Sequence, residues 1–139
     1  MRAFYDTKVL LDVLLKREPF CQDSARAWTL AEVGRVEGYI SAVSFTNVFY
    51  IVHGARDREE AQRVVRTMAH IFTPATCDAM VIRQAIDSNL PDFEDAVQYF
   101  SALHAGAECI LSRDLGGYPR RPAVPVLSPT AFLAQLEIA

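Results

Sequence analysis

The sequence lacks the features that mark membrane and secreted proteins. No apolar run approaches the ~18 to 20 residues that a membrane-spanning helix requires, and the N-terminus shows no signal-peptide pattern. It also lacks internal repeats and low-complexity tracts, and its 139 residues, 51% of them hydrophobic, suit one globular domain over residues 1–139. We therefore expect a cytoplasmic protein with a single core and no membrane partner.

Residues that commonly bind zinc or form disulfides are few and scattered. The three cysteines, Cys21, Cys77 and Cys109, include no C-x-x-C pair, which argues against a disulfide framework and against a structural zinc site. The three histidines are isolated, with no second ligand four residues away. The net charge of −3 gives no general attraction to nucleic acid, so a nucleic-acid partner would need a local basic patch.

Short apolar segments alternate with amphipathic ones along the whole chain. The short segments predict β-strands at 2–6, 39–43, 71–75, 109–111 and 124–127. Helical spacing and capping residues predict helices at 9–15, 24–33, 45–53, 58–68, 78–86, 92–105 and 129–136. Strands that alternate with helices favour a parallel sheet covered on both faces. The predicted fold class is therefore α/β, a three-layer αβα sandwich around a mostly parallel sheet of four or five strands.

The segment 91–106 organises the predicted site. Its apolar residues follow the spacing of a buried helical stripe: Phe93, Ala96, Val97, Phe100 and Leu103. Asp92 and Asp95 lie off that stripe in the first turn, where neighbouring negative charges repel. One interpretation is structural, with Asp92 as the helix N-cap and Asp95 interacting with the helix dipole. The other is a site that needs a positively charged ligand.

Further acids converge with these two in the predicted sheet. Asp6 ends the first strand, and Asp114 follows the strand after the central helix. In a parallel sheet the carboxyl ends of the strands and the starts of the following helices share one edge, where ligands bind. Carboxylates gathered there require compensation, which a hard divalent cation such as Mg²⁺ or Mn²⁺ provides. That arrangement suits phosphodiester hydrolysis by metal-activated water, with Lys8 and Arg113 either positioning the phosphate or serving as ordinary surface cations.

Several short motifs, in order along the whole chain, together resemble the PIN-domain nucleases. They are Asp6-Thr7 with Val9-Leu10-Leu11-Asp12, the helix opening Ser44 to Tyr50, Asp92-Phe93-Glu94-Asp95-Ala96 with Ala102 and Ala105-Gly106-Ala107, Ser112-Arg113-Asp114, and Leu127-Ser128-Pro129. The resemblance implies a Mg²⁺- or Mn²⁺-dependent endoribonuclease of the kind that serves as the toxin in toxin–antitoxin pairs. In that family, residues in the positions of Asp6, Asp95 and Asp114 bind the catalytic metal ion, and Thr7 supports the first of them.

The resemblance also implies further ligands and partners. A fourth acid usually stands near Asn47, whose neutral amide would hold the ion less tightly, and Asp92 is placed to compensate. The implied partners are an RNA substrate, a second copy of the chain in a homodimer, and an antitoxin protein with a segment along the acidic groove. The helix at 45–52, with aromatic neighbours such as Phe20 and Tyr50, supplies either core packing or the surface for such a partner.

Two positions depart from the PIN pattern. Lys8 stands where the family more often has Asn or another small polar residue, and Gly117-Tyr118 replaces an Asp-Phe pair. The reduced acidic cluster leaves an alternative function, a catalytically weak or inactive PIN-like module that binds RNA or protein. A haloacid-dehalogenase-like phosphatase fits less well because it needs a second Asp where Lys8 stands. A receiver domain would need paired acids before its acceptor strand.

Overall fold

A parallel β-sheet forms the centre of the structure, a computed structural model that describes residues 1–138. Its five strands are β1 (Arg2–Tyr5), β2 (Glu37–Ser41), β3 (Thr73–Ala75), β4 (Cys109–Leu111) and β5 (Val126–Leu127). The helices are α1 (Thr7–Leu14), α2 (Cys21–Glu32), α3 (Ala42–Ala55), α4 (Arg58–Ile71), α5 (Ala79–Ser88), α6 (Phe93–His104) and α7 (Pro129–Ile138), with a short 3₁₀ helix η1 (Leu115–Gly117). Within the described residues, no helix has the length and hydrophobicity needed to cross a membrane.

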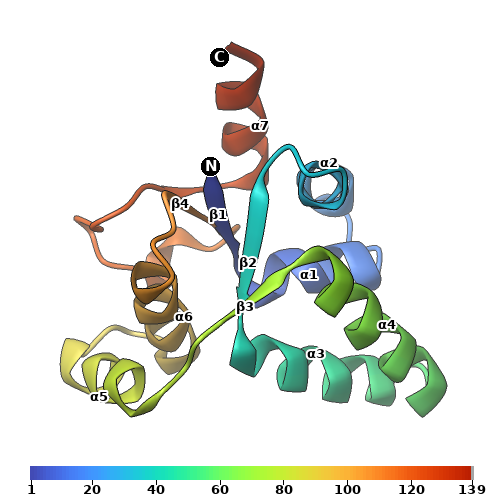
Figure 1. The fold of residues 1–139 in the computed structure, drawn as a ribbon, viewed down its shortest axis with the longest axis horizontal. Coiled ribbons are helices and arrows are strands. Elements are labelled where there is room, and N and C mark those ends of the chain that lie inside the picture. The colour runs from blue at the N-terminus through green and yellow to red at the C-terminus, as the bar shows by residue number, and fades with distance from the viewer. Residues whose placement is uncertain (139) are drawn as a thin grey trace.

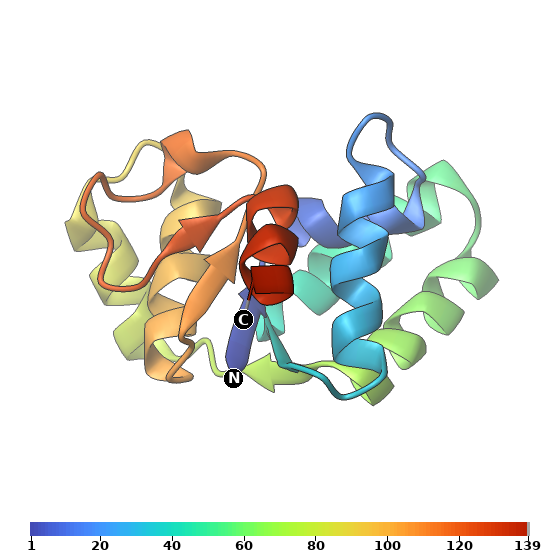
Figure 2. The same ribbon diagram turned by 90° about the horizontal axis from the view of Figure 1, so that it is seen from above.

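The strand order β3-β2-β1-β4-β5 places β1 at the middle of the sheet. Side chains alternate between the two faces, so that Ala3 and Tyr5 enter one hydrophobic cluster while Phe4 enters another. Helices α5 and α6 cover the Phe4 face, and α1, α2 and α4 lie on the opposite side (Figures 1 and 2). The predicted three-layer α/β fold with a parallel sheet is therefore confirmed, with five strands.

The boundary between β2 and α3 lies earlier than the sequence predicts. The strand begins at Glu37 because its residues pair with β1, with Glu37 opposite Arg2. Ser41 is the N-cap of α3, and its hydroxyl accepts the Val43 N–H at 3.2 Å. The predicted start of this helix at residue 45 was therefore wrong, because α3 begins at Ala42. The strand predicted at 71–75 is present as β3, although it contains Pro74. Strand β3 lies at the edge of the sheet, where a proline is tolerated.

Helix α6 is oriented differently from the predicted apolar stripe at its first turn. Ala96 and Val97 are buried as expected, but Phe93 is 53% exposed and Asp95 is 2% exposed. The Asp95 side chain packs closely against Gly117, in the segment after β4. A carboxylate rather than an aromatic ring is therefore buried at the start of α6.

Candidate active site

Asp6 lies at the carboxyl end of the central strand, where the chain enters α1. Its backbone N–H donates to the Leu111 carbonyl of β4 at 2.9 Å, which fixes it at the sheet edge. Its buried carboxylate is the N-cap of α1: Oδ1 accepts the Lys8 N–H at 2.8 Å. Oδ2 accepts the Tyr118 hydroxyl at 2.6 Å and the Ser112 hydroxyl at 3.3 Å. Burial raises the pKa of Asp6, while these hydrogen bonds act in the opposite direction.

A buried polar network connects α1 to α3 and α6 beside Asp6. The Thr7 N–H donates to Gln98 Oε1 at 2.8 Å, and the Thr7 and Ser44 hydroxyl oxygens lie 2.6 Å apart. All three side chains are buried. Ser44 and Gln98 are not among the predicted site residues, although Gln98 lies one helical turn after the acids of α6 and so shares their face. The network fixes the start of α1, and with it the orientation of Asp6.

The first turn of α6 brings two more acids to the same edge. Asp92 is the N-cap, and its Oδ1 accepts the Asp95 N–H at 3.0 Å. Asp95 Oδ2 is buried and has no hydrogen-bond partner within the described residues. Burial, reinforced by the charges of Asp6 and Asp92, raises the pKa of Asp95 from 3.8 to about 7. A buried carboxylate oxygen without a partner is costly, so Asp95 is a strong candidate for binding a cation.

Asp114 follows β4 and lies near the surface, with its side chain 51% exposed. Its Oδ1 caps η1 by accepting the Gly116 N–H at 3.2 Å. Its Oδ2 lies 3.4 Å from Lys8 Nζ. Lys8 therefore faces an acid in this structure, and any contact with a phosphate would require it to leave Asp114.

Glu94 is an acid of the site that was not predicted from the sequence. Its pKa is raised by partial burial of the carboxyl group and by the charges of Asp6 and Asp92. Together with Thr7 and Asn47, it lines a cavity of about 410 Å³ between α1 and α3. In the sequence Glu94 resembles an ordinary first-turn acid, so only the packing of α3 against α1 reveals its position. Asn47 is half-buried on the wall of this cavity.

The two residues that replace the Asp-Phe pair of the PIN pattern both contact the acids. The Tyr118 hydroxyl donates to Asp6, as described above. Gly117 packs directly against Asp95, and a Cβ at this position would lie 2.8 Å from the Asp95 Cγ and closer still to Oδ2. Because position 117 is a glycine, it supplies no carboxylate to the site. The neighbouring Tyr118 hydroxyl orients Asp6 instead.

Replacing Gly117 with Ala is expected to destabilise the protein by about 1 to 3 kcal/mol, because the added methyl group overlaps the Asp95 carboxylate. Denaturant unfolding measures this change. Gly116→Ala is the matched control, since its Cβ would lie 3.5 Å from Asp114 Oδ1, an ordinary contact. Equal losses of stability in the two variants would contradict the close approach of Gly117 to Asp95.

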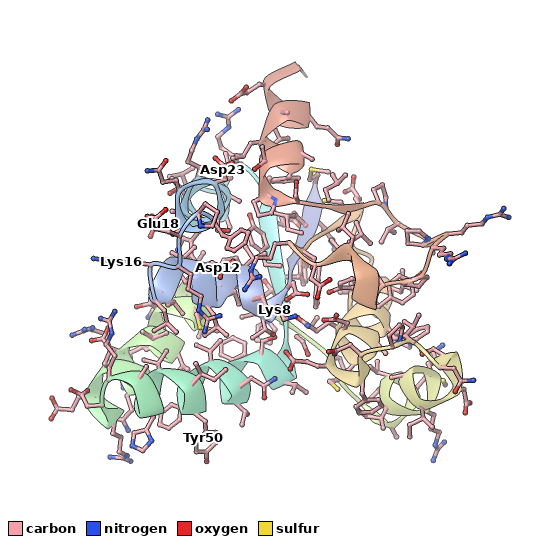
Figure 3. The ribbon with its side chains drawn as sticks, turned by 180° about the vertical axis from the view of Figure 1, so that it is seen from behind. Lys8, Asp12, Lys16, Glu18, Asp23 and Tyr50 are labelled. Carbon is pink, nitrogen blue, oxygen red and sulfur yellow. The ribbon has the colours of Figure 1, made fainter. Side chains whose placement is uncertain are left out.

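Arg113 does not point toward the acids. Its Nε donates to Asp12 Oδ2 at 2.7 Å, and its guanidinium carbon lies 4.4 Å from the centre of the Phe20 ring. Asp12 is fully buried on α1 (Figure 3). The structure therefore places the Arg113 guanidinium in an ion pair with Asp12 of α1 and over the Phe20 ring, rather than on Asp6, Asp95 or Asp114.

The site as a whole is a group of carboxylates at the carboxyl edge of the sheet, contributed by β1, α6 and the segment after β4. Among the described residues, no three acidic, histidine or cysteine side chains are already close enough together to hold a metal ion. Lys8 and Tyr118 instead contact two of the acids. The fold and the site together define a parallel α/β protein with an acidic candidate active site. The site lies at the carboxyl ends of the strands, where such proteins bind ligands.

Comparison with known families identifies that class. A family model described as the PIN domain matches residues 2–116, and the chain therefore belongs to the PIN-domain family. The resemblance inferred from the sequence is confirmed.

Individual relatives agree with this assignment. The chain is 25% identical over 136 residues to the protein named Ribonuclease VapC1 from Aquifex aeolicus (strain VF5), covering 94% of this chain and 92% of that protein. Its fold is similar to that of VapBC-1 from nontypeable Haemophilus influenzae, with a TM-score of 0.68 and 11% identity over 94% of this chain and 99% of the other. A toxin-antitoxin complex from Klebsiella pneumoniae gives a TM-score of 0.67 and 16% identity over 91% and 97% of the two chains.

Proposed function

We propose that this chain is a metal-dependent endoribonuclease and the toxin of a toxin–antitoxin pair, acting on RNA in the cytoplasm. The observation that carries the proposal is the buried Asp95 carboxylate, whose Oδ2 has no hydrogen-bond partner in the part of the chain that the structure describes and which lies near the charges of Asp6 and Asp92. The relative from Aquifex aeolicus is named a ribonuclease, and similar folds occur in toxin–antitoxin complexes. These similarities support the substrate class and the partner.

The donor set suits Mg²⁺ or Mn²⁺, because both ions prefer carboxylate oxygens and retain bound water. Asp6, Asp95 and Asp114 would hold the ion, with Asp92, Glu94 and Asn47 around them. Bound there, a divalent cation would activate water and stabilise negative charge on the phosphate. The protein's own contribution is to fix Asp6 through Tyr118 and to bury Asp95 away from competing hydrogen bonds.

The proposal includes two protein partners. An antitoxin segment would cover the acidic groove, and a second copy of the chain would form a homodimer. Tyr50, 66% exposed on α3, lines the 410 Å³ cavity beside Thr7 and so offers an apolar contact next to the acids. Trp28, by contrast, is 8% exposed and belongs to the core.

Cleavage of RNA by the purified, antitoxin-free protein tests the proposal. We expect cleavage with Mn²⁺ or Mg²⁺ and none in excess EDTA, because the carboxylates would supply no nucleophile without the ion. Absence of cleavage at any metal concentration would overturn the nuclease assignment. It would favour an inactive PIN-like interaction module, consistent with Gly117 where an acid is common.

A further inference from the structure

Lys8 is a cation that the structure places among the acids of the site. It lies in the first turn of α1, and its backbone N–H is bound by the Asp6 carboxylate at 2.8 Å. Its ammonium group lies 3.4 Å from Asp114 Oδ2. The same side chain lines the cavity shared by Thr7, Asn47 and Glu94. Lys8 therefore contacts two acids of the site, Asp6 through its backbone and Asp114 through its ammonium group.

The Lys8–Asp114 ion pair differs from an ordinary surface salt bridge because the Lys8 backbone is itself bound by an acid of the site. The Lys8 backbone N–H is held by the buried Asp6 carboxylate, so the side chain starts at the sheet edge and its ammonium group stays within one side-chain length of the acids. The site holds several carboxylates, and Lys8 supplies a positive charge that offsets their mutual repulsion. Figure 3 shows Lys8 at the inner end of α1, and Lys16 beyond its outer end and pointing away from Lys8.

We propose that Lys8 is a tethered counter-ion that occupies Asp114 in the metal-free protein and must release it when a divalent cation binds. This inference rests on the proposed function, because it concerns the ion that the nuclease would use. Lys8 and the ion compete for the same carboxylate oxygen, so Lys8 weakens metal binding. Once displaced, the ammonium group remains attached to α1 next to the substrate groove.

The competition raises the concentration of metal ion at which the site fills. In the absence of the ion, Lys8 partly neutralises the acids and keeps the site ordered. A divalent cation must overcome both the loss of the Lys8–Asp114 contact and repulsion from the nearby ammonium group. The wild-type protein would therefore require a higher concentration of the ion than a variant with a neutral side chain at position 8.

Direct measurement of Mn²⁺ binding tests this inference, by calorimetry or by the electron paramagnetic resonance signal of free Mn²⁺. Lys8→Met keeps most of the side-chain volume and removes the charge, and we expect it to bind Mn²⁺ about three- to tenfold more tightly. Lys8→Arg keeps the charge and should bind as the wild type does. Lys16→Met is the matched control for net charge and should change the affinity less than about twofold, because an exposed charge far from the site is screened by salt.

The outcomes separate this inference from the proposed function. Equal or weaker Mn²⁺ binding by folded Lys8→Met would overturn the role of Lys8, while Mn²⁺ binding by the wild type would still support the nuclease. Tighter binding by Lys16→Met to the same extent would also overturn it, because net charge alone would then explain the effect. No Mn²⁺ binding by the wild-type protein would overturn the proposed metal site and this inference together.

Discussion

On the proposed function, replacing Asp95 with Asn is expected to reduce metal-dependent RNA cleavage by at least about a hundredfold, because the variant would lose a charged ligand of the proposed metal site. The amide is nearly the same size as the carboxylate, so it fits the space beside Gly117. Cleavage of a fluorescent RNA with Mn²⁺ measures the loss. Retention of full activity in the variant would contradict the assignment of Asp95 to the site.

The same substitution should leave the protein as stable as the wild type at low pH and more stable at higher pH. The folded-state pKa of Asp95 is raised to about 7, so between pH ~4 and ~7 the folded state binds more protons than the unfolded state at this group. Wild-type stability therefore falls as the pH rises through that window, whereas Asn does not titrate. We expect an advantage for Asp95→Asn on the order of 1 to 3 kcal/mol at pH 8 relative to pH 4 in metal-free denaturant unfolding. A large loss of stability at both pH values would indicate a purely structural role.

Replacing Arg113 with Met is expected to destabilise the protein by about 3 kcal/mol, because it leaves the Asp12 carboxylate buried without its partner. Asp12 is 0% exposed, and its Oδ1 already has no hydrogen-bond partner within the described residues. The expected loss of stability lies at the low end of the range for a broken buried ion pair, because the Arg113 side chain is 26% exposed. Thermal and denaturant unfolding measure the change.

A second substitution distinguishes the ion pair from a role in binding RNA. In the double variant Asp12→Asn/Arg113→Met, no buried charge remains unpaired, so much of the lost stability should return. Recovery of stability together with RNA cleavage would confirm that Arg113 acts as a structural residue. Unchanged stability of Arg113→Met accompanied by loss of cleavage would instead support the phosphate contact predicted from the sequence.

The convergence of the acids follows from the order of the elements and was predictable. Asp6 and Asp114 follow two neighbouring parallel strands, whose last residues Tyr5 and Leu111 are paired. The carboxyl ends of such strands meet at one edge, and the start of α6 joins them there. Locating the acids therefore required the strand order but no side-chain detail.

Contacts between distant parts of the chain were not predictable in the same way. Asp12 and Arg113 are 101 residues apart, and Asp6 and Tyr118 are 112 residues apart. Periodicity indicates which positions are buried but not which partners they meet after the chain folds. The acid Glu94 was overlooked for a related reason, because its place in the site depends on α1 and α3.

Two of the acids at the sheet edge are also N-caps of α-helices, since Asp6 caps α1 and Asp92 caps α6. Loss of an N-cap aspartate costs roughly 1 kcal/mol, so on the proposed function a descendant of this chain that no longer cleaved RNA would still be selected to retain both. Asp95 caps no helix, and its buried Oδ2 has no hydrogen-bond partner within the described residues, so its ionised form destabilises the fold unless a cation lies nearby. In a relative of this chain, an intact Asp6 would therefore be poor evidence of nuclease activity. Replacement of the acid at position 95 would be the earlier sign that the proposed nuclease activity has been lost.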